Sequence, residues 1–307
     1  MIKAKTTKDT NIETYIKKYG TLAPKRYRCS DIKKITDSFA EKLGEGGFCS
    51  VYKGKLEDGS LVAVKVLKTG VSIGNGEEFL NEVISICKTS HVNIVSLIGY
   101  CYTKDKQALL FEFMPNGSLE KFIHNENIST AGRLAWDKLH EIAIGIARGL
   151  EYLHRGCSTR ILHLDIKPHK CARGTVGYIA PELFNRNFGR VSHKADVYSF
   201  GMMVLEMVGG RKNIDESADY PHCFYDRLQN ENCLGLHGVT TSHDNEIAKK
   251  MIIIGLWCIQ TYPVHRPSMN EILFMLEGNL DALKIPPKPF IHTPSRTPLD
   301  LYTTPIA

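Results

Sequence analysis

The first third of the chain alternates between short apolar runs and polar breaks, a pattern typical of β-strands. The four strand-like runs are Val51 to Leu56, Leu61 to Leu67, Ile94 to Ile98 and Ala108 to Phe113. Asp58-Gly59 separates the first two runs and predicts a tight hairpin turn between them. Residues 77 to 89 have helical character, so this part of the chain should form a twisted antiparallel sheet with one helix.

After Pro115-Asn116-Gly117 the apolar spacing becomes helical. One stripe repeats at helical spacing through Leu139, Ile142, Ile146, Leu150 and Leu153. Val197 to Val208 is apolar on nearly every side, which predicts a helix buried in the middle of a lobe. Ser268 and Glu271 have the spacing of a capping box at the start of a late helix. The predicted fold class is α+β, with a small β-rich lobe joined to a larger α-helical lobe.

Composition and charge narrow the class of protein. The chain is 43% hydrophobic and 23% charged, which is ordinary for a globular protein and excludes a disordered or fibrous one. Its net charge of +6 arises within residues 1–42, which hold eleven Lys/Arg and five Asp/Glu. Such a basic end suits nucleic acid, an acidic membrane surface or plain solvation, but no interleaved aromatic residues favour nucleic acid. Nucleic acid is therefore not an expected partner.

The sequence contains neither a recognisable targeting signal nor a cysteine pattern typical of disulfide-bonded or zinc-binding proteins. No run reaches the roughly 18 apolar residues of a membrane span, and no signal peptide follows the first methionine, so a cytoplasmic protein is expected. The nine cysteines show no Cys-x-x-Cys spacing, which indicates neither a disulfide framework nor a zinc site. Reduced, mostly structural thiols are expected.

A glycine-rich turn and an inward-facing lysine suggest phosphate chemistry. Gly44 and Gly46 precede the first strand and would let backbone amides approach phosphate oxygens, although glycines in a hairpin are often only a turn. Alternation places Ala63 and Lys65 on one face of the second strand, beneath this loop. Glu82, on the predicted helix, is a candidate partner for Lys65, and such a pair serves structure about as often as function.

Two further motifs give a family resemblance. They are His163-Leu164-Asp165-Ile166-Lys167-Pro168 and Ala180-Pro181-Glu182. With the glycine loop and Lys65 they resemble the eukaryotic protein kinases, and more closely the cytoplasmic domains of plant receptor-like Ser/Thr kinases of the leaf-rust-resistance type. The resemblance covers roughly residues 12 to 290 and implies a bilobal protein-kinase-like fold. It implies a basic juxtamembrane-like tail (1–38), an N-lobe with hinge (39–114), a C-lobe (115–284) and a Pro-rich C-terminal tail (285–307).

The resemblance also implies roles for individual residues. Those expected to bind ATP are Gly44, Gly46, Val51, Ala63, Lys65, Phe111, Glu112 and Met114. Asp165 would accept or orient the proton of the substrate hydroxyl, Lys167 would steady the transferred phosphoryl group, and Glu82 would hold Lys65. Lys167 and Gly174-Thr175 resemble Ser/Thr rather than Tyr kinases. Glu182 and Arg266 would form a buried ion pair, and Asp196 would anchor the catalytic loop.

The chain departs from the family pattern in two places. Leu164 replaces the arginine that many kinases carry there, as in the non-RD receptor-like kinases. More severely, Lys170 stands where the pattern has a metal-binding Asn, and the metal-binding Asp-Phe-Gly has no counterpart. No Asp, Glu or Asn lies between Asp165 and Glu182. Relative to the family layout, roughly thirty residues are missing between 170 and 171. No metal ligand can be assigned, so the sequence gives Mg²⁺ no protein anchor.

Two functions therefore stay open. The first is ATP-dependent phosphorylation of protein Ser/Thr in plant receptor-like, defence-type signalling. The second is a catalytically dead pseudokinase that acts as a scaffold or decoy for an active receptor-like kinase. The shortened segment itself has three open explanations: a skipped exon or misassigned intron, a natural pseudokinase, or unusual metal use. The expected partners are a protein substrate or a partner receptor-like kinase, with the basic tail able to contact the inner face of the plasma membrane.

Overall fold

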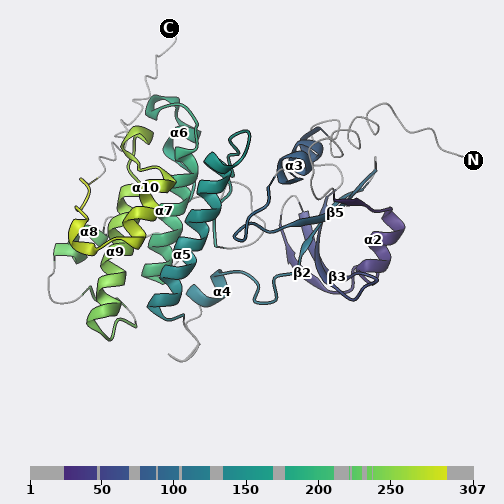
Figure 1. The fold of residues 1–307 in the computed structure, drawn as a ribbon, viewed down its shortest axis with the longest axis horizontal. Coiled ribbons are helices and arrows are strands. Elements are labelled where there is room, and N and C mark those ends of the chain that lie inside the picture. The colour runs from purple at the N-terminus through teal and green to yellow at the C-terminus, as the bar shows by residue number, and fades with distance from the viewer. Residues whose placement is uncertain are drawn as a thin grey trace, which may run out of the picture.

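The computed structural model separates a sheet-based lobe from a helical lobe (Figure 1). It describes residues 24–46, 49–68, 77–87, 89–103, 106–124, 134–168, 177–210, 221, 223–229, 234–236 and 238–288. The segment after β6 joins the two lobes and leads into α4, a short helix spanning Glu120–Ile123. The predicted α+β class and the two-lobe arrangement are both confirmed.

The N-lobe contains a six-stranded sheet. Its strands are β1 (Lys25–Arg26), β2 (Lys42–Glu45), β3 (Cys49–Lys55), β4 (Leu61–Leu67), β5 (Leu97–Tyr102) and β6 (Gln107–Glu112). Their order is β1-β5-β6-β4-β3-β2, and all neighbours are antiparallel except β1 and β5, which are parallel. The predicted hairpin joins β3 to β4, where the Ser60 carbonyl accepts from the Leu56 N–H at 2.9 Å and Gly59 adopts a φ of 90°.

Each face of the sheet is covered by one helix. The α2 helix (Cys29–Ile35) packs its Ile32 against Val62, Val64 and Leu110, which are fully buried. The α3 helix (Glu77–Cys87) packs against the other face, where its Val83 meets Leu109. Because strand residues alternate between faces, Ala63, Lys65 and Phe111 lie on the α3 side of the sheet.

Two predictions for the N-lobe differ from the structure. Residues 24–38 were assigned to a tail, yet they carry β1 and α2, and Ile32 is only 4% exposed. The segment is rich in lysine and arginine, so its composition does not indicate the short apolar face formed by Tyr27, Ile32 and Ile35. The strand predicted at Ile94 to Ile98 begins three residues later, at Leu97, because His91 to Asn93 form a turn closed by the Ile94 N–H to His91 carbonyl bond of 3.0 Å.

The C-lobe is built around a buried helix. Its longer helices are α5 (Trp136–Glu151), α7 (Lys194–Gly209), α9 (Ser242–Cys258) and α10 (Met269–Glu277). Shorter elements are the π-helix η2 (Tyr152–Gly156), α6 (Pro181–Phe184), η3 (Arg186–Phe188), α8 (Cys223–Gln229), η4 (Pro263–His265) and η5 (Leu280–Ala282). As predicted, nearly all of α7 is buried, and Ser268 caps α10 through a capping box with Glu271.

The predicted stripe on α5 is only partly correct. Leu139, Leu150 and Leu153 are buried, but Ile142 and Ile146 are half-buried. The residues with no exposed surface on this helix are Ala143 and Ala147. Small side chains therefore mark the closest packing of α5, which a count of large apolar residues does not detect.

The start of the predicted C-terminal tail is docked on the C-lobe. Tyr225 and Gln260 both donate to the Pro287 carbonyl, at 2.9 and 3.2 Å, and the Trp257 indole donates to the Lys284 carbonyl at 2.7 Å. Pro286 is buried. These contacts extend the packed lobe to residue 288, four residues beyond the predicted boundary at 284.

Candidate active site

The nucleotide side of the site is set by the register of three strands. Lys65 on β4 lies opposite Val51 on β3 and Leu109 on β6. Ala63 lies opposite Phe111, so the small and the aromatic side chain are neighbours on the face that carries Lys65. The sheet therefore brings together Val51, Ala63, Lys65 and Phe111, four of the residues predicted to bind a nucleotide. The side chain of Glu82 lies outside the described residues, so its predicted pairing with Lys65 stays a prediction.

The glycine-rich turn joins β2 to β3. Gly44 lies opposite Val51, and the Gly46 N–H donates to the Cys49 carbonyl at 2.9 Å, which closes the turn. Residues 47 and 48, within the turn, lie outside the described residues. Hydrogen bonds from Lys42 and Lys68 lower the pKa of the exposed Glu45 carboxyl to about 2, so Glu45 stays ionised beside the turn.

The segment that connects the lobes offers backbone hydrogen-bonding groups. Glu112 is tied to Ser96 twice, because the Ser96 N–H donates to Glu112 Oε1 at 2.9 Å and the Glu112 N–H donates to the Ser96 carbonyl at 3.3 Å. The Met114 carbonyl accepts from the Gly117 N–H at 3.2 Å. Within the described part of the chain, the Met114 N–H has no acceptor, so it is available to a planar base.

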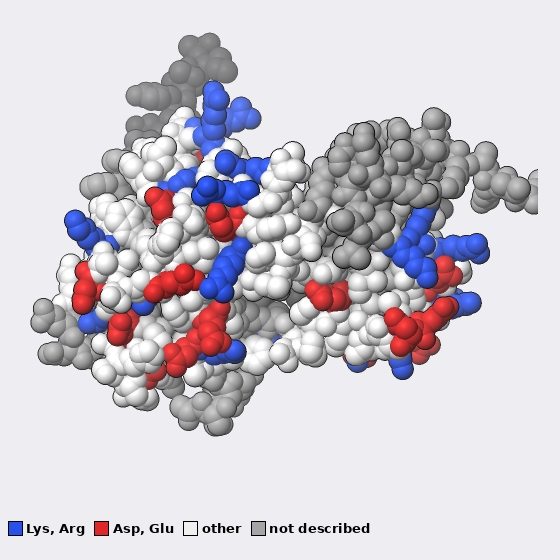
Figure 2. Space-filling view, viewed as in Figure 1, with Lys and Arg blue, Asp and Glu red and all other residues white. Residues whose placement is uncertain are grey.

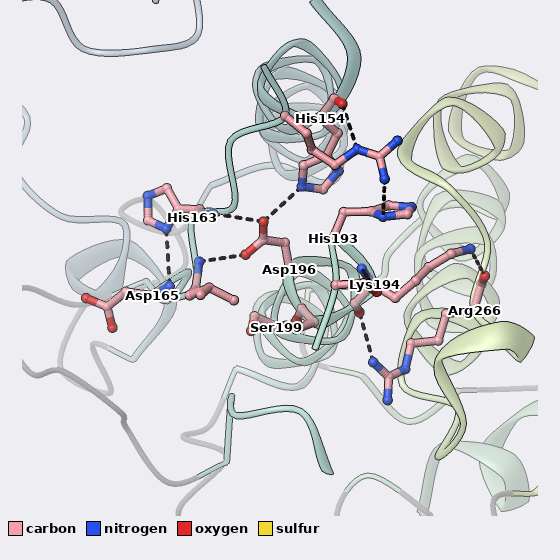
Figure 3. A network of polar contacts seen from close by, with 12 residues as sticks. His154, His163, Asp165, His193, Lys194, Asp196, Ser199 and Arg266 are labelled. Carbon is pink, nitrogen blue, oxygen red and sulfur yellow. Dashed lines mark hydrogen bonds and ion pairs between the residues drawn. The ribbon is translucent and has the colours of Figure 1, made fainter. Parts of the chain in front are cut away.

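A buried carboxylate holds the loop that carries Asp165. Asp196, at the start of α7, has no exposed surface. It accepts hydrogen bonds from the His163 N–H at 2.9 Å, the Leu164 N–H at 2.7 Å and His154 Nε2 at 2.8 Å (Figure 3). Leu164 adopts a φ of 54°, a left-handed conformation that costs a non-glycine residue roughly 1–2 kcal/mol. The bond to Asp196 offsets this strain and fixes the loop.

Asp165 and Lys167 contact each other directly. Lys167 Nζ donates to Asp165 Oδ1 at 2.6 Å, and the Lys167 side chain is only 5% exposed, whereas that of Asp165 is 38% exposed. The Asp165 N–H donates to His163 Nδ1 at 3.3 Å. The carboxylate is therefore presented to solvent from a loop whose backbone is held on both sides, with a buried cation against it.

A second layer of polar residues supports this loop from behind. Arg160 donates to the His154 carbonyl at 3.2 Å and to His193 Nδ1 at 3.1 Å (Figure 3). Burial and the nearby Arg160 charge lower the pKa of His193 to about 4. His193 is therefore neutral at neutral pH and keeps a lone pair for Arg160. No role was predicted for any of these three residues; His154 lies in a π-helix and Arg160 in an irregular loop.

The predicted ion pair between Glu182 and Arg266 is present and buried. The guanidinium donates to both carboxylate oxygens, at 2.7 and 2.8 Å, and neither side chain is exposed. Its remaining N–H groups donate to the carbonyls of Gln260, Lys194 and Thr261 at 2.7, 2.9 and 2.9 Å. All five N–H groups of Arg266 are therefore satisfied, which is what makes a buried guanidinium tolerable.

Comparison with known proteins decides the family. The model of the protein tyrosine and serine/threonine kinase family matches the chain in two segments, residues 38–172 and 167–276. The chain belongs to the protein kinase family. Together the matched segments cover most of both lobes, and Asp165 falls in the first segment, close to the point where the second begins.

Relatives of this kinase include plant receptor-like kinases. It is 48% identical to the PR5-like receptor kinase of Arabidopsis thaliana, over 89% of this chain and 46% of that protein. It is 46% identical to the rust resistance kinase Lr10 of Triticum aestivum, over 92% of this chain and 50% of that protein. It is 47% identical to the leaf rust 10 disease-resistance locus receptor-like protein kinase-like 2.4 of Arabidopsis thaliana, over 87% of this chain and 49% of that protein. The chain thus spans about half the length of these curated relatives.

The kinase chain anchors on α7 the stretches on both sides of residues 169–176. Asp196 holds the loop that ends at Pro168, and three residues later Ser199 donates to the Tyr178 carbonyl at 2.7 Å. Tyr178 is buried and opens the stretch that leads to Glu182. Residues 169–176, which join the flanks, lie outside the described residues.

The kinase chain offers few metal ligands. Among the described residues, no group of three His, Cys, Asp or Glu side chains is placed to hold a metal ion. Asp165 is the only Asp, Glu or Asn from Asp165 up to Glu182 in the sequence, and its carboxylate is bound by Lys167. Mg²⁺ prefers several oxygen ligands, so the donor set of this loop does not fit a magnesium site. No helix of the described chain is long and apolar enough to span a membrane.

Proposed function

We propose that this chain is a serine/threonine protein-kinase-like domain of a plant receptor-like kinase, with a fold built for ATP-dependent phosphoryl transfer to protein hydroxyls and with impaired or absent catalysis. The catalytic loop held by Asp196, with Lys167 bound to Asp165, carries the family function. The lack of any Asp, Glu or Asn between Asp165 and Glu182 carries the impairment. Lys167 and Gly174-Thr175 favour Ser/Thr over Tyr as the acceptor residue.

The N-lobe residues fit a nucleotide. Lys65, oriented by Glu82, would neutralise phosphate oxygens, and the amides of the loop containing Gly44 and Gly46 would donate to them. Ala63, Val51 and Phe111 would enclose the base, whose edge would bond to the backbone of Glu112 and Met114. Val51, Ala63, Lys65 and Phe111 share the face of the sheet that α3 covers, and Glu112 ends strand β6. ATP, when bound, supplies the phosphoryl group.

The loop residues would act on the acceptor hydroxyl. The Asp165 carboxylate is partly exposed and can take the proton of a serine or threonine hydroxyl, while Lys167 can neutralise charge that develops on the transferred group. The magnesium ligands that the family uses have no counterpart here. Asp165 and Lys167 can position the reacting groups, but without the metal ion the negative charge on the phosphates is not neutralised. Loss of one positioned electrostatic group costs on the order of 10²–10³ in rate, and two are missing.

Two observations support a missing internal segment as the origin of this loss. The family model matches two segments that meet at residues 167–172 instead of one continuous stretch. The comparison with the PR5-like receptor kinase spans 314 positions but covers 89% of 307 residues, which is about 273, so about 41 positions of that relative have no counterpart here. A gene-model error, a natural pseudokinase and unusual metal use all remain compatible with such a gap.

A scaffold or decoy role is the second candidate function. It is favoured by a complete N-lobe sheet and a fully satisfied Glu182–Arg266 pair beside a loop without metal ligands. A partner kinase would bind the folded lobes, which do not depend on the missing chemistry. The receptor-like relatives suggest a place at the cytoplasmic side of the plasma membrane, with the basic N-terminal segment close to the lipid surface. The proposed lobes, residues 39–114 and 115–284, would form the part that partners bind.

Transfer of labelled phosphate tests the catalytic part of this proposal. The purified chain is incubated with labelled ATP, Mg²⁺ or Mn²⁺ and a protein substrate, beside Asp165→Asn. We expect no more transfer than in Asp165→Asn, because the variant lacks the base and the wild type lacks the metal ligands. Transfer well above that control would contradict impaired catalysis.

Nucleotide binding is measured separately, by calorimetry with ATP in the absence and presence of Mg²⁺. We expect the chain to bind ATP and Lys65→Ala to weaken this binding. Lys55→Ala, at an exposed position of β3, should leave the ATP affinity unchanged. Mg²⁺ should not increase the ATP affinity. Absence of ATP binding in the folded wild type would contradict the nucleotide site. For the scaffold role, co-purification with an active receptor-like kinase is expected from plant extract, and its absence would count against that role.

A further inference from the structure

Two cysteine sulfurs from different elements of the N-lobe lie in contact. Cys29 is the first residue of α2 and Cys101 lies on β5, and their Sγ atoms are 3.3 Å apart. A disulfide has an S–S distance of about 2.05 Å, so the sulfurs need to close a gap of only about 1.3 Å. Cys101 is 1% exposed, whereas Cys29 is half-buried and reachable from solvent.

Backbone pairing holds the two sulfurs in this position. β1 pairs with β5 through Lys25 opposite Gly99 and Arg26 opposite Tyr100. The Tyr27 N–H extends this pairing by donating to the Tyr100 carbonyl at 2.8 Å. Cys29 follows two residues later, and Ile32 of the same helix belongs to the apolar cluster that contains Cys101. The approach of the sulfurs is therefore built into the packing of α2 on the sheet.

Three other described cysteines lack such a partner. Cys87, Cys157 and Cys258 are free thiols, and within the described residues none of them has a second cysteine sulfur in contact. Burial raises the pKa of Cys87 to about 11 and raises that of Cys157 and Cys258 above its usual value, which disfavours their reactive thiolates. Burial, followed by the nearby Cys29, raises the pKa of Cys101 to about 12, so Cys101 is held as a thiol beside Cys29.

We propose that Cys29 and Cys101 form a redox modification site that hydrogen peroxide oxidises to a disulfide, which fastens α2 to β5. The Cys29 thiolate would attack the peroxide: an S–O bond forms, the O–O bond breaks, and hydroxide leaves and is protonated to water. Cys101 sulfur then attacks the sulfenic acid of Cys29, so that the S–S bond forms and the S–O bond breaks. The departing hydroxide takes the Cys101 proton as a second water. Two thiols are oxidised and one peroxide is reduced.

The disulfide would constrain the part of the chain that carries the nucleotide residues. The closed loop runs from residue 29 to residue 101 and includes β2, β3, β4 and α3. Cross-linking a loop of this length restricts the unfolded chain and stabilises the folded lobe. Oxidation would thus fix the segment of residues 24–36 on the sheet, and a disulfide reductant would release it. This site is independent of the catalytic state of the chain.

Mass spectrometry tests the cross-link. The full chain is treated with hydrogen peroxide, free thiols are alkylated, and the protein is digested without reduction. We expect a peptide that links Cys29 to Cys101, that is lost on reduction, and that Cys29→Ser abolishes. Cys157→Ser, at a half-buried cysteine without a neighbouring sulfur, is the matched control and should retain the link. Recovery of Cys29 as an alkylated thiol or a sulfonic acid, with no linked peptide from the folded chain, would overturn the proposal.

Thermal unfolding gives an independent readout. The peroxide-treated wild type should melt several degrees higher than the reduced form, roughly as expected when a long loop is closed. Cys29→Ser, which keeps the buried Cys101 in place, should show no such shift. An equal shift in Cys29→Ser, or no shift in a wild type that carries the link, would show that the disulfide does not fasten α2 to the sheet.

Discussion

The Asp196 carboxylate accepts hydrogen bonds from three donors with its two oxygens, and Asp196 has no exposed surface. His163 and Leu164 donate through their backbone N–H groups and His154 through Nε2. In Asp196→Asn the amide NH₂ would face one of these donors. We expect the free energy of unfolding to fall by about 2–3 kcal/mol and the His163 and Leu164 amides to exchange faster with deuterium. Urea unfolding and hydrogen exchange measure the two effects.

Asp137→Asn is the matched control for this substitution. Asp137 pairs with His243 at 3.0 Å, but both side chains are mostly exposed, so we expect a loss below about 1 kcal/mol. Unchanged exchange at His163 and Leu164 in Asp196→Asn would show that the carboxylate does not hold the loop.

His193 gives the fold a pH dependence with a defined sign. Its pKa in the folded chain is about 4, against an ordinary value of 6.5, because of burial and then the Arg160, His154 and Lys194 charges, with Asp196 acting in the opposite direction. Between these values the unfolded chain binds a proton that the folded chain does not. Stability is therefore complete above pH 6.5 and falls as the pH drops towards 4. Because His193 is partly exposed, solvent screening limits the effect to about 1 kcal/mol.

Urea unfolding above pH 6.5 and at about pH 5 measures this effect in the wild type and in His193→Gln. The glutamine oxygen can still accept from Arg160 but does not titrate, so the variant should lose about 1 kcal/mol less over this range. His243→Gln, at an exposed position, is the control and should behave as the wild type. Identical slopes in wild type and His193→Gln would contradict the assignment.

Family motifs predicted part of this residue-scale network. The resemblance predicts roles for Asp196, Glu182 and Arg266, and their contacts are as expected. It predicts none for His154, Arg160 and His193, whose contacts depend on a π-helical turn that brings residue 154 beneath the loop. The apolar period of α5 continues through that turn, so a periodic pattern does not reveal it.

At the scale of elements, the contact between β1 and β5 depends on Gly99. A Cβ at this position would lie 2.6 Å from the Lys25 carbonyl oxygen and would also overlap the Tyr27 ring. Gly99→Ala should therefore push β1 off β5, with a stability loss of about 1–3 kcal/mol. Hydrogen exchange at the Tyr27 amide, which donates to Tyr100, should accelerate.

The Leu56 amide in the β3–β4 hairpin serves as the internal control for Gly99→Ala and should exchange as in the wild type. A Tyr27 amide that exchanges as fast in the wild type as in the variant would show that residues 24–38 are a tail, as their composition predicted. The same substitution should also abolish the link between Cys29 and Cys101, since β1 sets the position of Cys29.

Element prediction succeeded where local chemistry decides and failed where packing decides. Asp58-Gly59 specifies its hairpin, and Ser268 with Glu271 specifies the start of α10, because each acts on its own backbone. The α2 helix was missed because Ile32 and Ile35 form an apolar face only once they lie on β3 and β4. Gly54 permits this packing, since a Cβ there would lie 2.7 Å from the Ile35 side chain.

For the whole molecule, the anchors around the catalytic loop belong to the C-lobe itself. Asp196 and Ser199 of α7 hold the stretches before residue 169 and after residue 176, and Glu182 is fixed to Arg266. All four residues are buried in the C-lobe, so their contacts do not depend on the metal ligands that the family pattern places between Asp165 and Glu182. On the face shown in Figure 2, acidic and basic side chains occur on both lobes, which agrees with the balanced charge of the sequence beyond residue 42.

Restoring the missing ligands should therefore restore catalysis without rebuilding the fold. In the variant, Lys170→Asn is combined with an inserted segment of roughly thirty residues that contains Asp-Phe-Gly, placed before Cys171. We expect Mg²⁺-dependent phosphoryl transfer to rise from the Asp165→Asn background by at least about 10²-fold, because two ligands for the ion are returned beside Asp165. The same insert with Ala in place of its Asp matches the length but lacks the metal ligand, and should stay at background. Equal activity of both inserts would show that the length of the segment, not the metal, limits the chain, and inactivity of both would place the defect elsewhere in the site.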